Sequence, residues 1–504
     1  MEAESHPQSI LAHLRPDTIS SLNPIVWDRT LARAANYVLV AGALLLAASL
    51  PHSIAAADIS LGICLLGWIL RDLSLKKFHC RRTGFELPIL FFSVWTIASA
   101  ALSVEPGLSL PKLRSLLLFI LIYLVAGNFN ERGAKLILVV LLASGLTGAL
   151  FSLGEKLIGR GVVISRIDDS SPLRGTGVET GDVIWLINKK RVGSLEEINA
   201  EIKKLGAGRT AEIEALHNGD PIPVQVRIEE GMRTDTNPIG IVAGGKSRQF
   251  RASGFSRHFL TFAEQMQLFA LFVIGAALWS LRRKGPSAWL SPPLAALMFA
   301  VFSISLGLTA TRAVIASFLL TTFMIAVAAA PNRKVASGMA LLVMLVALLA
   351  GLAVIKTRDD SMARFSDDST SRRIGYMKAG LRVIPFHPVF GVGMDSHKNH
   401  WEDWGFPGTY VTHTHSTPIQ IAMERGVPAL IFYLWLFASL AISFYKRYLK
   451  EAGWYDLGAL ACVTGFFLSS LTNYNFGDSE SLMLFFFLLS ISLALRDKTN
   501  TQAS

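Results

Sequence analysis

Arginine and histidine side chains gather in two polar stretches that border long apolar segments. The first is the sequence TATR, which ends at Arg312, and the second contains Arg372, Arg373, His413 and His415. A guanidinium group donates two parallel hydrogen bonds to phosphate oxygens and does not lose its proton. An imidazole, with a reference pKa of about 6.5, can accept a proton from a hydroxyl group near neutral pH. These residue types together suit the transfer of a group from a phosphate to a hydroxyl.

Each of these residues also has a simpler structural interpretation. Arg312 could be an interfacial arginine that extends its charged end to water, and His415 could cap a helix. His413 and His415 form a His-x-His pair, which can supply two metal ligands. Further candidate ligands nearby are His387, Asp395, His397, His400, Glu402 and Asp403. Their spacing does not favour a third ligand, so we expect neither a metal nor any other cofactor.

Three more residues near these stretches have two interpretations each. Glu424 either pairs with the adjacent Arg425 or orients His415, and the sequence does not separate the two. Arg257 and His258 precede an apolar segment, where they either contact the same substrate or anchor the chain at the membrane interface.

The composition indicates what kind of protein positions these residues. Of the 504 residues, 51% are hydrophobic and 17% are charged, and the mean hydropathy is +0.43. A soluble domain carries about 25% charged residues, so an ordinary soluble enzyme is excluded. The 30 Phe and 10 Trp exclude a disordered chain. The three cysteines form no disulfide framework or zinc motif. We therefore predict a polytopic membrane protein.

Twelve apolar stretches are candidates for membrane-spanning helices. They centre near 35–51, 55–71, 86–103, 113–128, 134–154, 259–281, 288–307, 310–330, 335–355, 426–445, 455–474 and 481–495. Lys and Arg concentrate in every second loop, which places those loops and both termini in the cytoplasm. Lys112 and Arg114, on the outer side, are exceptions. Topology thus explains most of the net charge of +11, and we expect no nucleic-acid partner.

Two long polar segments, 155–257 and 356–425, fall on the outer side in this topology. Within the first, short β-branched runs at 162–164, 183–185, 213–215 and 224–226 indicate strands, and 196–205 has helical spacing. The sequence SSPLRGTGVETGDVIWLIN in this segment resembles a bacterial PDZ domain.

PDZ domains capture peptide C-termini by adding a strand to the edge of a sheet. The resemblance therefore implies a peptide or protein ligand, with the carboxylate-binding loop near Leu157–Val162. The alternative is a domain that only braces the membrane part. An intramembrane metalloprotease would need a zinc motif such as HExxH, which the sequence lacks, so we do not expect an intramembrane protease.

The second outer segment reads R…Y…HPVFGVG…HTHS…IQIAMERGVP and leads into a span. This order of motifs resembles the O-antigen ligase superfamily of membrane glycosyltransferases. In that family an arginine begins a helix, an HPxxGxG turn follows, and a histidine precedes Q-x-x-x-E-x-G at the start of a span. Together with TATR and the span count, the resemblance extends over nearly the whole chain except the PDZ-like insert. Ser416 and Tyr376 depart from the family's usual Asn and Trp.

The resemblance implies glycan transfer from undecaprenyl diphosphate to an acceptor, most directly the lipid A-core oligosaccharide. Arg312 and Arg372 would stabilise the charge on the departing diphosphate, with Arg373 as the alternative to Arg372, and His415 would be the base. Direct displacement inverts the anomeric centre and needs no metal. Further substrate contacts would come from Arg373, Arg257, His413 and Glu424.

We therefore predict a mainly α, polytopic protein of the bacterial inner membrane, with about 12 transmembrane helices and a small inserted α/β PDZ-like domain. The expected parts are a membrane part at 1–154, the PDZ-like domain at 155–231 and a second membrane part at 232–504, with the catalytic loop 356–425 facing the periplasm. The expected partners are the lipid-linked glycan, the acceptor, membrane lipids and a ligand of the PDZ-like domain.

Other functions compete with this one. A polysaccharide polymerase and a protein O-oligosaccharyltransferase belong to the same superfamily. A transporter or flippase is disfavoured, because the charged residues concentrate in one outer loop and not midway through the spans, where transport sites lie. A scaffold without catalysis would leave Arg312, Arg372 and His415 unexplained.

Overall fold

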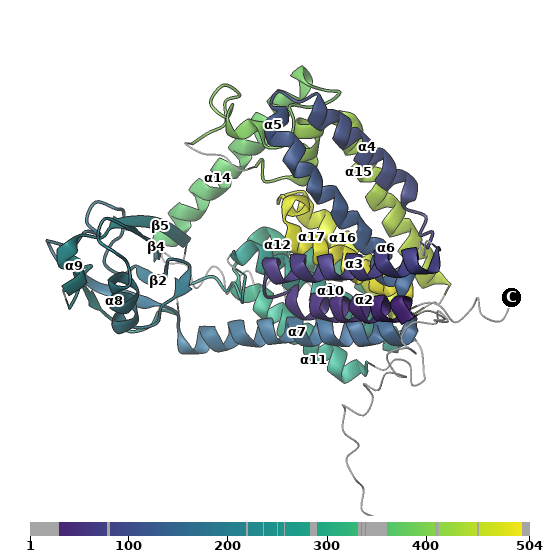
Figure 1. The fold of residues 1–504 in the computed structure, drawn as a ribbon, viewed down its shortest axis with the longest axis horizontal. Coiled ribbons are helices and arrows are strands. Elements are labelled where there is room, and N and C mark those ends of the chain that lie inside the picture. Colours follow the sequence, from purple (N-terminus) through teal and green to yellow (C-terminus); the bar gives the residue numbers. More distant parts are fainter. Residues whose placement is uncertain are drawn as a thin grey trace, which may run out of the picture. The chain divides into compact units, whose positions relative to one another are not determined.

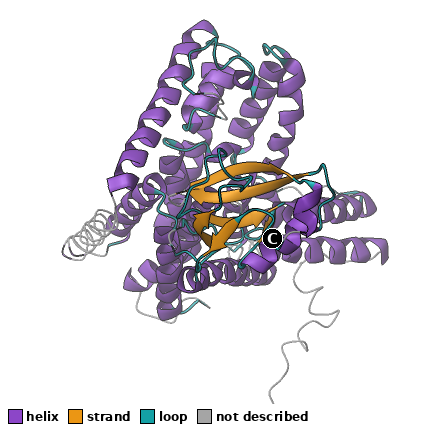
Figure 2. Ribbon diagram, turned by 90° about the vertical axis from the view of Figure 1, so that its left-hand side faces the viewer, coloured by secondary structure: helices purple, strands orange, loops and turns teal. Residues whose placement is uncertain are grey.

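The computed structural model describes residues 30–77, 81–217, 220–234, 236–248, 250–256, 258–282, 290–330, 334, 338, 360–408, 413–450 and 453–495. The chain divides into two units. A helical unit comprises Met1–Gly148, Phe255–Gly307 and Thr311–Ser504, and a unit with a β-sheet comprises Ala149–Gly254 and Leu308–Ala310. Figure 1 labels the helices, and Figure 2 distinguishes the strands from them by colour.

The helical unit is built mainly from apolar helices joined mostly by short turns, while α14 is polar. In chain order they are α2 (Thr30–Ser49), α3 (Ile54–Leu75), α4 (Glu86–Ala101), α5 (Pro106–Ser109), η2 (Leu110–Ile120), α6 (Leu121–Asn128), α7 (Glu131–Ile158), α10 (Phe259–Arg282), α11 (Pro292–Leu308), α12 (Arg312–Ala329), α14 (Asp360–Val383), η3 (Ile384–Phe386), η4 (Ser396–Lys398), α15 (Thr417–Leu449), α16 (Trp454–Ser470), η5 (Asn475–Gly477) and α17 (Ser479–Ala494). The elements labelled η are 3₁₀-helices.

Seven helices in the described part of the chain are long and apolar enough to cross a membrane, and α4, α11 and α17 are shorter apolar helices. The seven are α2, α3, the continuous segment Pro106–Asn128, α7, α10, α12 and α15. Eleven of the twelve predicted spans fall on helices, and the stretch 335–355, apart from residue 338, lies outside the described residues. The fold is thus that of a helical membrane protein, while the number of spans and the side of each terminus stay predictions.

Helix α10 is the most enclosed of the seven long helices, since 83% of its apolar window is buried inside the protein. It packs against α12, α16 and α17, and Phe269 stacks on Phe302 of α11 with ring centroids 5.1 Å apart. By contrast, only 39% of the corresponding window of α3 is buried. Helix α10 therefore forms the core around which the outer helices, with their exposed apolar side chains, are arranged.

The sheet unit contains strands β1 (Val162–Ile167), β2 (Val183–Ile187), β3 (Lys190–Arg191), β4 (Thr210–His217), β5 (Asp220–Arg227) and β6 (Ile241–Ala243), with helices α8 (Leu195–Lys203) and α9 (Glu230–Thr234). The strand order is β5-β4-β2-β1-β6, with β3 beside β2, and every pair is antiparallel. The predicted strands and helix of this unit are all present.

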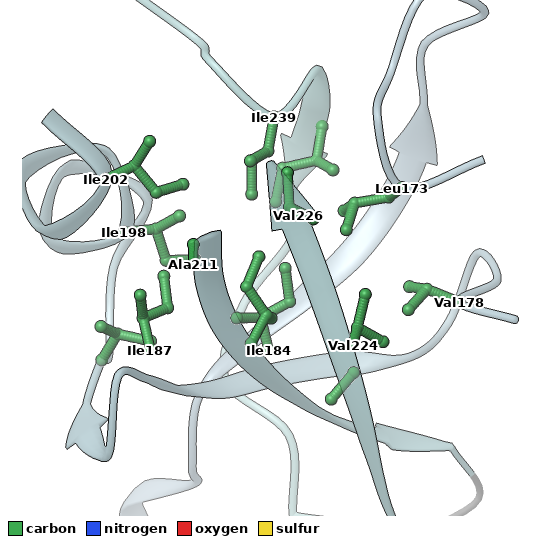
Figure 3. Packing of buried hydrophobic residues seen from close by; sticks show 14 of the residues in the cluster. Leu173, Val178, Ile184, Ile187, Ile198, Ile202, Ala211, Val224, Val226 and Ile239 are labelled. Atoms are coloured by element: carbon green, nitrogen blue, oxygen red, sulfur yellow. The ribbon is translucent and has the colours of Figure 1, made fainter. Parts of the chain in front are cut away.

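The core of the sheet unit is formed by aliphatic side chains from the strands and from α8 (Figure 3). Ile184 and Ile187 of β2 meet Ile198 and Ile202 of α8, and all four are fully buried. Ile239, just before β6, belongs to the same core. The sheet therefore extends beyond residue 231, the predicted end of this domain, because β6 completes it.

The structure does not place the predicted carboxylate-binding loop at a free sheet edge. Strand β1 lies between β2 and β6, so no added strand can pair with it. Arg160, two residues before β1, has only 6% of its surface exposed, and its backbone N–H donates to the Ser247 carbonyl at 2.7 Å. Its guanidinium binds the Glu155 carboxylate at the end of α7. The expectation for Leu157–Val162 is therefore wrong, because the chain's own residues 241–247 occupy that position.

Candidate active site

The histidine predicted to be the base lies just before helix α15, on a short segment with an unusual backbone conformation. His415 has a φ of +56°, a value that non-glycine residues rarely adopt and that must be held by its surroundings. The preceding residue, Thr414, donates its N–H to Gln420 Oε1 at 2.7 Å. Its hydroxyl donates to the Ser416 carbonyl at 3.1 Å. The first turn of α15 thus holds the segment that carries His415.

Aromatic rings from three separate parts of the chain surround His415. The His413 and His415 ring centroids are 4.2 Å apart, and the backbone N–H of His415 donates to His413 Nδ1 at 3.2 Å. Tyr376 of α14 stacks on His415 at 5.6 Å. Tyr474, between α16 and α17, lies 5.6 Å from His413. Gly380 of α14 allows Thr414 to approach closely, since a Cβ there would lie 2.7 Å from Thr414 Cγ2.

The surroundings of the two histidines disfavour their protonation. Burial lowers the pKa of His415 to about 3, and the neighbouring charges of His413 and Arg373 act in the same direction. Burial also lowers the pKa of His413 to about 4, with His397 and Arg373 as the next causes. His258 contributes to both shifts. In the free protein both imidazoles are therefore neutral at neutral pH, inside a basic environment that attracts an anion.

The predicted arginines are not equivalent in the structure. Arg373 is half-buried and its charge acts on both histidines, whereas Arg372, the preceding residue of α14, is exposed. Arg312 is the exposed first residue of α12. Among the described residues, no hydrogen bond, ion pair or ring contact joins Arg312 to His415. Arg257 lies outside the described residues, and its neighbour His258 stands before α10, where it accepts the Leu260 N–H.

Glu424 is a buried hub and not a surface group. Only 1% of its surface is exposed. Its Oε1 accepts the Asp395 N–H at 3.0 Å and the Gln420 Nε2–H at 2.8 Å. Tyr474 Oη approaches Oε2 at 3.5 Å. The ion pair predicted with Arg425 is loose, with Arg425 Nη2 at 3.9 Å from Oε2. Glu424 therefore links the segment that follows the HPVFGVG turn, helix α15 and Tyr474 through hydrogen bonds to its carboxylate.

The HPVFGVG turn packs against a break in helix α15. Gly426 has a φ of +82° and interrupts the helix. There the Val392 N–H donates to the Met423 carbonyl at 2.9 Å, and the Val427 N–H donates to the Pro388 carbonyl at 2.8 Å. A Cβ on Gly426 would lie 1.8 Å from the Val389 carbonyl oxygen. The glycines of these two motifs therefore serve close backbone packing, and the predicted span start at residue 426 coincides with this break.

Sequence reasoning gave no role to two residues of this arrangement. Gln420 is the first residue of the Q-x-x-x-E-x-G motif. Its i, i+4 spacing to Glu424 on a helix indicates that the two side chains meet. Tyr474 fell inside the predicted span 455–474, but α16 ends at Ser470, and the following residues return to the histidines. In the described part of the chain, no group of three or more His, Cys, Asp or Glu side chains could hold a metal ion.

Comparison with known proteins supports both motif interpretations. Residues 294–434 match the family model described as O-antigen ligase. This range contains all the predicted site residues except Arg257. The chain thus contains a segment that matches an O-antigen ligase domain, together with helices long and apolar enough to cross a membrane.

A second family model, described as PDZ domain, matches residues 143–228. The expected combination of an O-antigen ligase domain with an inserted PDZ domain is therefore confirmed. Over 85 residues, 16% of this chain, the sequence is 33% identical to the magnetosome formation protease MamE of Paramagnetospirillum magneticum. The match covers 12% of that protein's length.

Proposed function

We propose that this protein transfers a glycan from undecaprenyl diphosphate to an acceptor hydroxyl, with the lipid A-core oligosaccharide as acceptor, at the periplasmic face of the bacterial inner membrane. The observation that carries the proposal is the strained, neutral His415 beside the charge of Arg373, inside the domain that matches O-antigen ligase. A neutral imidazole next to an anion-attracting group is what a base acting on a diphosphate-linked sugar requires.

The proposed reaction is a single displacement. The acceptor oxygen attacks the anomeric carbon, and its proton passes to the imidazole of His415. The bond between the anomeric carbon and the diphosphate oxygen breaks, and its electron pair leaves with the diphosphate. The configuration at the anomeric carbon is inverted. This chain's residues supply the proton acceptor, the positive charges and the orientation of the reactants.

Arg373 is the arginine that we place on the diphosphate first. Its charge reaches both histidines, so a phosphate bound to it lies within electrostatic range of the base. Arg372, the adjacent residue on α14, would bind a second phosphate oxygen or the glycan. Arg312 would contribute from the start of α12 after the substrate has bound. His413 and Arg257 are proposed as further donor contacts.

The test is a transfer assay with the purified full-length protein in lipid nanodiscs. Undecaprenyl-diphosphate-linked glycan is the donor and rough lipopolysaccharide is the acceptor. His415→Ala and Arg373→Ala are compared with Arg382→Ala, which removes an exposed cation from the same helix. We expect transfer in the wild type and in Arg382→Ala, with a loss of about 10²-fold or more in the other two. Wild-type activity in His415→Ala would refute the role of this histidine.

The same assay with other acceptors identifies the acceptor that this protein uses. Longer lipid-linked chains without modified lipopolysaccharide would indicate a polymerase. Glycosylation of an added protein would indicate an oligosaccharyltransferase. If no acceptor is modified but the donor crosses a sealed vesicle, the protein is a transporter and the proposal fails.

For the PDZ domain we propose a peptide ligand that pairs with β6, since β1 is enclosed between two strands. The side chain of Asn237 is an obstacle at this edge. Its amide donates to the Ile241 carbonyl at 2.9 Å and accepts the Ile241 N–H at 3.3 Å. A ligand strand would have to displace Asn237 from these backbone groups.

A further inference from the structure

Two buried side chains on one face of α15 connect the His415 segment to the interior of the helical unit. Gln420 and Glu424 are one helical turn apart, and they are 0% and 1% exposed. Gln420 Oε1 accepts the Thr414 N–H at 2.7 Å, and Gln420 Nε2 donates to Glu424 Oε1 at 2.8 Å. A continuous chain of hydrogen bonds thus runs from Thr414 through Gln420 to Glu424.

The chemistry of Glu424 fixes which way the amide of Gln420 points. Glu424 Oε1 already accepts the Asp395 N–H, so this oxygen acts as a hydrogen-bond acceptor. The NH₂ group of Gln420 must therefore face Glu424, and its carbonyl oxygen must face Thr414. With the opposite orientation, an N–H would point at the Thr414 N–H and an oxygen at the carboxylate. Glu424 thereby selects the orientation in which Gln420 can hold the Thr414 backbone.

Glu424 is itself fixed by rigid neighbours. Its carboxylate accepts the Asp395 N–H at 3.0 Å. Its backbone carbonyl accepts the Gly393 N–H at 2.8 Å and the Ser99 hydroxyl at 3.2 Å. Ser99 belongs to α4, an apolar helix of the membrane unit. The hydrogen-bond chain therefore ends on elements that do not depend on the His415 segment.

A direct role of Glu424 in chemistry does not fit these contacts. The group is buried, so it does not reach a substrate in this structure. It is also not the third member of a catalytic triad. His415 Nδ1 is buried without a hydrogen-bond partner among the described residues, whereas a triad carboxylate would accept a proton from the histidine ring. The effect of Glu424 must pass through the backbone that Gln420 holds.

We propose that Gln420, oriented by Glu424, is the positioning residue for His415: it holds the Thr414 N–H and so maintains the left-handed backbone that aims the imidazole at the substrates. This inference rests on the proposed role of His415 as the base. A misplacement of about 1 Å at a reacting group costs about 100-fold in rate. Loss of the Gln420 carbonyl is therefore expected to lower kcat while the donor KM changes little.

The experiment compares four forms of the full-length protein in nanodiscs: wild type, Gln420→Met, Glu424→Gln and Gln225→Met. Methionine matches glutamine in length but neither accepts nor donates these hydrogen bonds strongly. Gln225→Met makes the same exchange at an exposed position of β5. Backbone hydrogen exchange of the peptide containing Thr414, the thermal midpoint, and kcat and KM for lipid-linked glycan are measured for each form.

We expect Gln420→Met to speed exchange at Thr414 by about tenfold or more and to lower kcat by about 10- to 100-fold, with the donor KM within about threefold of wild type. Glu424→Gln, which retains one acceptor oxygen, should lie between it and wild type. Gln225→Met should match wild type. Unchanged exchange at Thr414, or a change in KM alone, would overturn the inference.

A double variant separates positioning from general structural damage. If Gln420 acts only through His415, adding Gln420→Met to His415→Ala should cause no further loss of activity. A second loss as large as the first would contradict the inference. If the wild type transfers no glycan at all, the proposed function fails, but the exchange measurement still decides whether Gln420 holds the Thr414 backbone.

Discussion

The pH dependence of transfer offers a quantitative test of the His415 environment. Burial and the charges of His413 and Arg373 lower the pKa of His415 to about 3 from its reference value of 6.5. At pH 5.5, an imidazole of pKa 6.5 is about 90% protonated, whereas one of pKa 3 is less than about 1% protonated. An ordinary histidine base would thus lose about tenfold in kcat/KM at pH 5.5, and His415 should lose almost nothing.

Donor binding should reverse part of this shift. Both phosphates of a disubstituted diphosphate carry one negative charge across pH 4 to 9, so the donor brings two charges that do not titrate. A unit charge about 7 Å from the imidazole, at an effective dielectric constant of about 20, interacts by about 2 kcal/mol. Two such charges favour the protonated form and raise its pKa by about 3 units. The base in the donor complex should therefore titrate near pH 6.

The assay is initial-rate transfer between pH 4.5 and 8.5 at several donor concentrations with saturating acceptor. kcat/KM for the donor reports the free enzyme and kcat reports the complex. We expect kcat to fall on the acid side of its pH profile (the acid limb) with an apparent pKa near 6. We expect kcat/KM to show no such fall above pH 5. Arg373→Gln should move both limbs to higher pH, because it removes a positive charge that disfavours protonation. A kcat/KM limb near pH 6.5 that this variant does not move would refute the reasoning.

Three further predictions concern other parts of the protein. Arg373→Ala should lower kcat/KM for the donor by about 10²- to 10³-fold in the transfer assay, and donor binding by the variant should weaken in parallel. Gly426→Ala should destabilise the protein by more than about 2 kcal/mol, because its Cβ would overlap the Val389 carbonyl at positive φ. Gly307→Ala, with open space around its helical position, should not lower the thermal midpoint. Asn237→Ala should free the backbone of Ile241 and tighten binding of a fluorescein-labelled heptapeptide that ends in valine, measured by anisotropy with the full-length protein; unchanged anisotropy would exclude β6 as the peptide edge.

The sequence predicted the positions of the helices better than their contacts. Apolar runs of about 20 residues identify spanning helices almost by length alone, and alternation identified the longer strands of the PDZ domain. Strand β6 was not predicted because Ile241–Ala243 is too short to show the alternation of apolar and polar residues that marks a strand. Tyr474 was missed because the predicted span 455–474 included the mostly polar stretch 469–473, whereas α16 ends at Ser470 and leaves Tyr474 outside the helix.

The choice between Arg372 and Arg373 shows why the site could not be completed from sequence. Successive residues on a helix point about 100° apart. Which of the two faces the histidines depends on the rotation of α14, and packing against α15 sets this rotation. The role of Gln420 is of the same kind. Its spacing to Glu424 is visible in the sequence, but its partner Thr414 is brought to it by the left-handed turn at His415.

The buried, positively charged surroundings of His415 imply that the bound donor activates the base. Burial, together with the charges that attract a diphosphate, lowers the pKa of His415 and makes it a weak base in the free enzyme. Donor binding supplies the negative charge that restores its basicity. An acceptor that binds first therefore meets a base unable to take its proton, while a bound donor activates the site. Proton transfer therefore requires the bound donor, and a limb that appears in kcat but not in kcat/KM would show this activation.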